Sequence, residues 1–315
     1  MLNRLDRRLL QELDLNSRRS NAAIAKKLGV GKNVVNYRIK QLIERGVIRY
    51  FYTIVDPARF GYFGIRIYLK FRRATPKKEN EIIDFAVKNK YVWVCERADG
   101  EYSLAVALWI KNIDDFYNFW YEYDRRYRRY FADVTISFYC EVWDFGNSFL
   151  SLERKTKEPA ITGGTKSNVK MAELDWKILS CISNDARLPT VEISKNVGAS
   201  PITVKNRIDY LKKSGVILAF TVLLNREKLG LVQYKLNFHL KDLSQYSRFA
   251  ELAKTQPQTI YIDKTVGYAD FEVEVLVESY AMFLEIIDEY KKAFPDEILD
   301  HGYVIYHEEA KIRYY

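Results

Sequence analysis

Apolar residues fall at helical spacing in two similar stretches of this 315-residue chain, at residues 31–48 and 200–217. In the first stretch, Val35, Ile39 and Leu42 lie on one stripe of a helix, and the sequence Gly-Val-Ile then breaks the period. The second stretch repeats this order, including its Gly-Val-Ile ending. Each stretch therefore predicts a helix that ends at a glycine and leads into a strand.

The opposite face of the first helix carries amide, phenol and ammonium groups instead of the Glu/Lys mixture of an ordinary solvated helix. Such groups suit DNA, because an amide can pair bidentately with adenine and cations bind phosphates or guanine. For base edges the candidates are Asn33, Asn36 and Tyr37, and for phosphates or guanine they are Lys32, Arg38 and Lys40. The alternative is that these are ordinary solvated helix residues.

The corresponding face of the second helix is chemically different. The positions of Asn33, Asn36, Tyr37 and Lys40 are taken there by Ile202, Lys205, Asn206 and Asp209. The DNA-contact candidates in this copy are Thr203, Lys205, Asn206 and Arg207. An acid near a phosphate costs binding energy, although it can accept from cytosine. We therefore expect the two helices to read different sequences and the second to bind more weakly.

The two stretches belong to a longer duplication. An ungapped alignment of residues 5–62 with residues 174–231 gives 16 identities in 58 positions. The identical pairs include Asp6 and Asp175, Gly29 and Gly198, Arg38 and Arg207, Gly46 and Gly215, and Gly61 and Gly230. A match of this length is a duplicated domain and not a short solenoid repeat.

Each copy begins with a predicted helix-turn-helix. In the first copy, an apolar helix precedes a short helix that Ser20 caps and Gly29 ends, and the candidate recognition helix follows closely. Residues 49–55 read as a strand, which is consistent with a small wing. In the second copy, Ser200 and Pro201 provide an N-cap and a first helical residue.

After each helix-turn-helix the order of predicted elements is βαββαβ, which is typical of a ferredoxin-like domain. In the first copy the ranges are 64–72, 76–88, 92–98, 103–110, 113–127 and 133–143, and in the second they are 233–241, 246–255, 259–265, 270–277, 280–294 and 298–310. The predicted fold class is α+β, with winged helix-turn-helix domains at 1–63 and 169–232, ferredoxin-like domains at 64–150 and 233–315, and a linker at 151–168 that contains Pro159 and two glycines.

The distribution of charge and the small number of cysteines and histidines restrict the functions that the chain can have. The net charge of +9 is concentrated on the two helix-turn-helix windows, where residues 1–64 carry 13 Lys/Arg against 5 Asp/Glu and residues 169–232 carry 10 against 6. The three cysteines (Cys95, Cys140, Cys181) and three histidines (His239, His301, His307) show no metal-ligand spacing, so we predict no metal, cofactor or catalytic site. The charged N-terminus and the lack of a long apolar run predict a cytoplasmic protein without a membrane span.

With these residues in view, the chain resembles the Lrp/AsnC family of feast/famine transcription regulators. The resemblance rests on the Leu-Asp start at residues 5 and 174, the R-I-x-x-L-x-x-x-G-V-I endings, and the ferredoxin-like unit behind each copy. It implies recognition helices in the major groove of double-stranded DNA and a second domain that dimerises and senses an amino acid or another small effector. The tandem arrangement departs from the usual single copy. It permits an intrachain pseudo-dimer or a homodimer.

The resemblance also places a Gly-x-x-Asp turn near the effector pocket. The second copy has Gly267, Tyr268 and Asp270 in this turn, whereas the first keeps Gly100 but has serine in place of the acid. A carboxylate can pair with an amino-acid ammonium, so we expect any effector site in the second half. A hairpin turn that needs glycine for its backbone is the alternative.

Three further points stay open in the sequence. The aromatic stripe Phe116, Phe119, Trp120, Tyr123, Tyr127 and Tyr130 is either core packing or an association surface. The chain also resembles the siroheme decarboxylases, which have this two-part fold and occur as tandem fusions, so an enzyme is one alternative function. A scaffold that has lost DNA binding is the other, and the basic charge of residues 1–64 argues against it.

Overall fold

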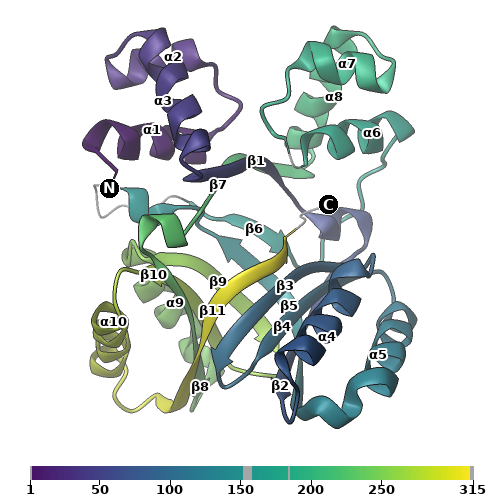
Figure 1. The fold of residues 1–315 in the computed structure, drawn as a ribbon, viewed down its shortest axis with the longest axis vertical. Coiled ribbons are helices and arrows are strands. Elements are labelled where there is room, and N and C mark those ends of the chain that lie inside the picture. The colour runs from purple at the N-terminus through teal and green to yellow at the C-terminus, as the bar shows by residue number, and fades with distance from the viewer. Residues whose placement is uncertain (1, 152–157, 184, 313–315) are drawn as a thin grey trace.

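Two three-helix heads lie next to each other at one end of the molecule, above a β-barrel (Figure 1). The computed structural model describes residues 2–151, 158–183 and 185–312. The first head contains α1 (Arg4–Leu15), α2 (Asn21–Leu28), α3 (Lys32–Glu44) and β1 (Ile48–Val55), and the second contains α6 (Glu173–Ile182), α7 (Thr190–Val197), α8 (Pro201–Lys213) and β7 (Ile217–Leu224).

The helix ends predicted from the sequence are confirmed. Ser20 begins α2 by accepting from the backbone N–H of Ala23, and Gly29 ends it in the left-handed conformation with φ 69°. Ser200 caps α8 in the same way, with Pro201 at the first turn. These caps fix the short turn between the two helices of each helix-turn-helix.

The wings join the two heads. β1 and β7 form a two-stranded antiparallel sheet in which Tyr52 pairs with Thr221, its own counterpart in the duplication. A pseudo-twofold axis therefore passes through this pair. One hydrophobic cluster spans both heads and includes Leu10 from the first and Ile178 from the second, both fully buried. The heads thus share one core.

The ferredoxin-like units form the barrel. The first unit contains β2 (Phe63–Phe71), α4 (Pro76–Lys88), β3 (Val92–Gly100), β4 (Leu104–Ile110), α5 (Ile113–Tyr127) and β5 (Phe131–Asp144), and the second contains β8 (Val232–Leu240), α9 (Tyr246–Thr255), β9 (Thr259–Val266), β10 (Phe271–Val277), α10 (Tyr280–Ala293) and β11 (Ile298–Ile312). The strand orders β5-β2-β4-β3 and β11-β8-β10-β9 are equivalent. The last strand of each unit pairs with the other unit, β5 with β9 and β11 with β3, so the two sheets close into one barrel.

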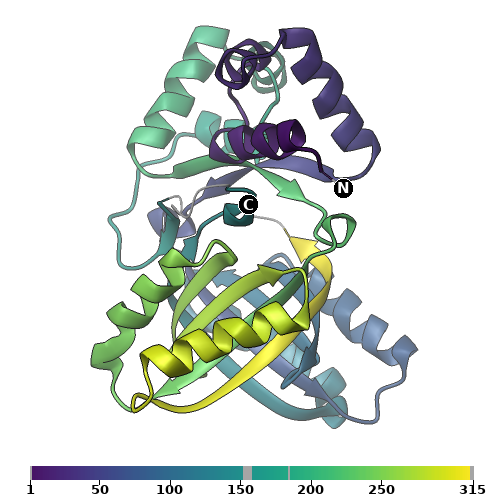
Figure 2. The same cartoon turned by 90° about the vertical axis from the view of Figure 1, so that its left-hand side faces the viewer.

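The helices of each unit cover the outside of the barrel (Figure 2). The aromatic stripe of α5 belongs to the core beneath it, because Phe116, Phe119 and Tyr123 are buried in one cluster with the strands. The aromatic residues that α5 does expose are Tyr117 and Tyr121, at 61% and 52%. Core packing is therefore the role of the predicted stripe.

The stretch predicted as a linker contains a strand, β6 (Ala160–Gly163), that pairs with the end of β5. Asp56 holds it, accepting from the backbone N–H of Gly163 at 3.0 Å and from Lys166 Nζ at 2.6 Å. Four residues next to a proline and two glycines give too short a pattern to predict as a strand. Short 3₁₀ helices occur at η1 (Pro57–Phe60), η2 (Arg128–Tyr130), η3 (Ser148–Leu150), η4 (Glu227–Leu229) and η5 (Leu243–Gln245).

Candidate nucleic-acid interface

The outward face of α3 is exposed and polar. Val35, Ile39 and Leu42 point into the core of the head. On the opposite side Lys32, Asn33, Asn36, Tyr37 and Lys40 are all exposed. Among them, Tyr37 is 64% exposed. The predicted DNA-contact face is therefore open to solvent in this structure.

Arg38 differs from its neighbours, because its guanidinium points inward. Its Nη1 donates to the carboxylate of Asp6 at 2.8 Å, and Asp6 is only 4% exposed. In the second copy Arg207 Nε donates to Asp175 at 2.7 Å, and the hydrogen bond to Asp175 raises the pKa of Arg207. Both arginines tie the recognition helix to the first helix of their head. This internal pairing makes Arg38 and Arg207 weaker candidates for DNA contact than the exposed residues of the same helices.

Asn36 has a partner within the protein. Its Oδ1 accepts from Asn21 Nδ2 at 2.6 Å, and Asn21 in turn accepts from Arg187 Nη2 of the other head at 2.6 Å. Bidentate pairing with adenine needs both the oxygen and the amino group of Asn36. In this arrangement the amino group and one of the two lone pairs of Oδ1 have no partner within the described part of the protein that would have to be displaced, whereas the other lone pair is taken by Asn21.

The face of α8 carries a weaker set of groups. Thr203, Lys205 and Asn206 are exposed, as expected for the second reading surface. Thr203 Oγ1 is hydrogen-bonded to the capping Ser200 at 2.8 Å, and the apolar Ile202 is 73% exposed. Lys205 is thus the one cation of this exposed set, compared with Lys32 and Lys40 on the first helix.

Two arginines fasten the heads to each other across the pseudo-twofold axis. Arg18 Nη1 donates to the carbonyl of Ala186 at 2.6 Å, and its counterpart Arg187 donates to the carbonyl of Ser17. Each guanidinium also lies over a wing ring of the other copy, Arg18 at 5.4 Å from Phe220 and Arg187 at 5.2 Å from Phe51. Burial lowers the pKa of both arginines. These contacts, with the β1–β7 ladder, give the heads one relative orientation.

The sequence interpretation did not identify Arg18 and Arg187 as functional residues. A signal was present, because both positions hold arginine at the same place in the duplication. An identity that survives between two copies that differ at most positions indicates a shared structural role.

The candidate effector residues lie where the two halves of the barrel meet. Gly100 and Gly267 have φ values of 104° and 118°, and a Cβ on either would lie within 2.7 Å and 2.5 Å of a backbone carbonyl of the other half. Asp270 accepts from the backbone N–H of Leu240 at 2.8 Å. The positive φ values agree with the alternative interpretation, in which the turn needs glycine for its backbone, and the close packing adds a second need for glycine.

Tyr268 connects the turns of the two halves. Its hydroxyl donates to Glu101 at 2.6 Å and accepts from Asn237 Nδ2 at 2.9 Å. Burial, followed by the hydrogen bond to Glu101, raises the pKa of Tyr268. Tyr268 thus connects the two halves through hydrogen bonds, and its hydroxyl stays protonated near neutral pH.

The described residues contain no group of three His, Cys, Asp or Glu side chains that could hold a metal ion. In the same residues, no helix is long and apolar enough to cross a membrane.

Comparison with known proteins agrees with the geometry of the heads. A family model for a winged helix-turn-helix DNA-binding domain matches residues 2–49 and again residues 171–217. The HTH-type transcriptional regulator FL11 of Pyrococcus horikoshii is 31% identical over 122 residues, which are 38% of this chain and 81% of FL11. The regulatory protein AsnC of Haemophilus influenzae is 29% identical over 109 residues, or 34% of this chain and 73% of AsnC.

A solved structure matches the whole tandem arrangement. The siroheme decarboxylase NirDL aligns with 99% of this chain and 93% of its own, with a TM-score of 0.66 and 13% sequence identity. At this identity the match concerns the fold alone. The matches to FL11 and AsnC each span less than two fifths of this chain, and the winged helix-turn-helix model matches it twice. The chain belongs to the Lrp/AsnC family of winged helix-turn-helix transcriptional regulators, in a tandem form.

Proposed function

We propose that one chain of this DNA-binding regulator places both heads on one double-stranded site and reads the sequence mainly through α3. The observation that carries the proposal is the joining of the heads. The β1–β7 ladder and the exchanged contacts of Arg18 and Arg187 hold two recognition helices in one orientation within a single chain. A single-copy relative needs a second chain to present two heads.

The chemistry of the exposed faces supports the dominance of the first head. Asn33, Tyr37 and Lys40 offer base-edge and phosphate contacts that the second head replaces with Ile202, Asn206 and a half-buried acid. Lys40 has only a loose surface pair with Glu44 at 3.7 Å, with 76% of its side chain exposed. A phosphate can therefore compete for Lys40 at little cost.

Binding stoichiometry and salt dependence test the two-headed arrangement. Two heads make on the order of six to ten phosphate contacts, and each contributes about −0.9 to the slope of log affinity against log salt. We expect one chain per DNA site and a slope steeper than about −3. Two chains per site, or a shallower slope, would contradict docking of both heads from one chain.

We also propose that the protein acts by binding alone and not by catalysis. The barrel pocket that lies below the wings contains Glu96, Asp263 and Glu274, and no histidine is among its lining residues in the described chain. Four carboxylates line the pocket against two arginines, Arg66 and Arg226, and this excess of acidic groups disfavours the carboxylates of a tetrapyrrole such as siroheme. The test is incubation with haem or iron-uroporphyrin. A stable Soret band would favour the decarboxylase alternative that the fold match to NirDL suggests.

The proposal retains an amino-acid effector at the second-half turn. Asp270 already accepts from the backbone N–H of Leu240 through Oδ2, so the ammonium of such a ligand would bind at the remaining acceptor sites of the carboxylate. Thermal shifts measured with the individual amino acids test this site. A shift that disappears in Asp270→Asn supports it, and the absence of any shift removes it.

A further inference from the structure

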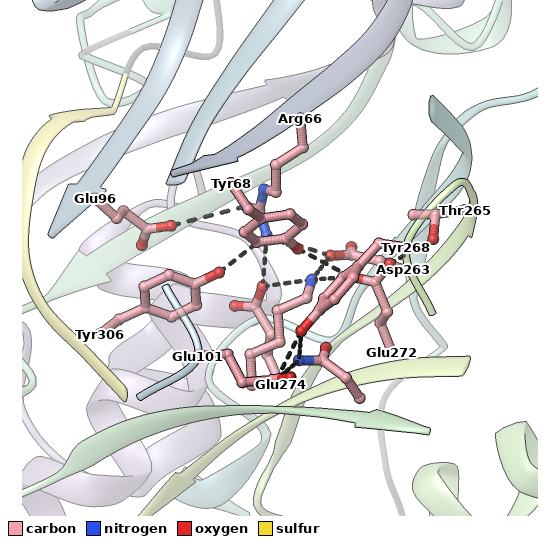
Figure 3. A network of polar contacts seen from close by, with 12 residues as sticks. Arg66, Tyr68, Glu96, Glu101, Asp263, Thr265, Tyr268, Glu272, Glu274 and Tyr306 are labelled. Atoms are coloured by element: carbon pink, nitrogen blue, oxygen red, sulfur yellow. Dashed lines mark hydrogen bonds and ion pairs between the residues drawn. The ribbon is translucent and has the colours of Figure 1, made fainter. Parts of the chain in front are cut away.

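Charged side chains fill the interior of the barrel where the two ferredoxin-like units face each other (Figure 3). Arg66 approaches Glu274 at 3.2 Å, Asp263 at 3.6 Å and Glu96 at 3.7 Å. Lys235, which is fully buried, contacts Glu272 at 2.8 Å and also Asp263 and Glu274. Four buried carboxylates thus surround two cations, which leaves an excess of negative groups.

The protonation of this cluster is uneven. Burial raises the pKa of Asp263 despite its two cationic neighbours. For Glu274, burial acts in the same direction, but Lys235 and Arg66 outweigh it and the pKa is lowered. Glu274 therefore keeps its negative charge at neutral pH.

A pocket opens beside this cluster at the end of the barrel that faces the wings. Its floor includes Arg66, Glu96, Asp263 and Glu274. Its walls are aromatic, because Trp93 and Trp109 stack with ring centroids 5.2 Å apart and Tyr139 and Tyr261 also line it. Ile54 and Val55 of β1 reach it from the head layer.

One polar detail indicates that the pocket is built for a ligand. Arg66 is 95% buried, yet its Nε has no hydrogen-bond partner, and Arg66 is one of the pocket-lining residues. An orphaned donor in such a place is costly unless an acceptor occupies the pocket. Gly64 also leaves room for the rings, since a Cβ there would lie 2.9 Å from the Tyr139 ring and 3.0 Å from Trp109.

We propose that this pocket binds a small organic cation that also carries a hydrogen-bond acceptor. The faces of the tryptophan and tyrosine rings attract a cation, and the carboxylates on the floor neutralise it. The acceptor takes the free N–H of Arg66. An anion is disfavoured, because Arg66 and Arg226 stand against four carboxylates in the lining, Glu96, Asp144, Asp263 and Glu274.

Within the described residues, the aromatic wall of this pocket occurs in one of the two units. β3 and β9 occupy equivalent places in the two units, as do β4 and β10. The positions equivalent to Trp93 and Trp109 hold Ile260 and Leu276, so the pseudo-twofold axis does not generate a second aromatic wall. One ligand per chain follows.

The pocket also connects a bound ligand to the heads, because two residues of β1 line it. A cation seated there contacts Ile54 and Val55 at the end of β1, the strand that pairs with β7. Occupancy of the pocket should therefore change the affinity for DNA. This regulatory part rests on the proposed function, whereas binding of the cation does not.

Calorimetry on the full chain without DNA tests the site. The probes are ethanolamine and choline, whose hydroxyl can accept from Arg66. Methylguanidinium, a cation without an acceptor, and 3,3-dimethylbutan-1-ol, the neutral isostere of choline, are the controls. We expect one site per chain and at least tenfold tighter binding of one probe than of the controls. Equal binding of probes and controls, or no binding, overturns the proposal.

Two variants locate the site. Trp109→Phe should weaken cation binding about fivefold or more, through loss of part of the ring attraction. Trp120→Phe, on α5 and outside the pocket, should leave binding unchanged. Glu96→Gln removes one carboxylate from the pocket floor and should also weaken cation binding. Its melting temperature shows whether the variant is folded. If Trp109→Phe binds as tightly as wild type, the pocket is not the site.

A second readout separates this inference from the proposed function. The bound cation should change DNA affinity in wild type but not in Trp109→Phe. If the protein binds the cation but no DNA, the cation site is supported and the proposed function as a regulator is contradicted. If the protein binds DNA but no cation, the proposed function is supported and the cation site is contradicted.

Discussion

Replacing Arg38 by alanine should destabilise the first head and leave the DNA-contacting face intact. The Arg38 side chain is 31% exposed and that of Asp6 is 6% exposed, so the pair lies between a surface and a buried ion pair. Breaking a buried pair costs about 3–5 kcal/mol, whereas an exposed pair contributes about 0–1 kcal/mol. We therefore expect Arg38→Ala to cost about 2–3 kcal/mol. In the second head, Arg207→Ala should cost more, because Asp175 is fully buried.

Scanning calorimetry and urea unfolding measure this loss, with Lys40→Ala as the matched control. Lys40 is exposed, so its replacement should change the free energy of unfolding by less than about 0.5 kcal/mol. At temperatures where both variants are folded, Arg38→Ala should bind DNA within about threefold of wild type, whereas Lys40→Ala binds more weakly. A double-mutant cycle with Asp6→Ala isolates the pair. Unchanged stability of Arg38→Ala together with weaker DNA binding would refute the structural role of Arg38.

Three other predictions concern the rest of the molecule. Combined Arg18→Ala and Arg187→Ala should loosen the heads and weaken DNA binding without loss of the barrel, seen as faster hydrogen exchange in the wings. Gly267→Ala should destabilise the barrel by more than 2 kcal/mol in urea unfolding, because its Cβ would lie 2.5 Å from the carbonyl oxygen of Ile136 at a φ of 118°. Burial lowers the pKa of His301, so stability should fall as the pH drops below about 6.5, and His301→Gln should flatten this dependence in melting temperatures.

Local sequence patterns were sufficient for most of the elements. The ranges predicted for α4 and α5 agree with the structure because each helix has a capping residue and a regular apolar stripe. The outward face of α3 followed from the same periodicity. Helix caps and apolar stripes are set by residues that are close in the sequence, so the sequence alone was enough to predict these helices.

The buried charges could not be predicted in this way. Along β8, Gln233, Lys235 and Asn237 alternate with apolar residues, which is the pattern of a strand with one face in water. All three are buried, because the sheet of the other unit covers this face. These side chains are buried because two sheets close into a barrel, and the pattern of residues within one strand cannot show this.

The inward turn of Arg38 has a similar cause. Helical spacing places position 38 at the edge of the outward face, where a cation suits a phosphate. Its partner, Asp6, stands 32 positions earlier on another helix. The paired identity of these residues in both copies was the available clue.

The most direct test of the account compares the two heads on one DNA site. Fluorescence anisotropy with a fragment from upstream of the protein's own gene, and random duplex as competitor, measures the affinity of Asn36→Ala/Lys40→Ala, Lys205→Ala/Asn206→Ala and the barrel control Lys292→Ala. We predict a loss of at least about tenfold for the first variant, a smaller loss for the second and none for the control. Equal losses in both heads, or wild-type binding by the first variant, would contradict reading through the first head.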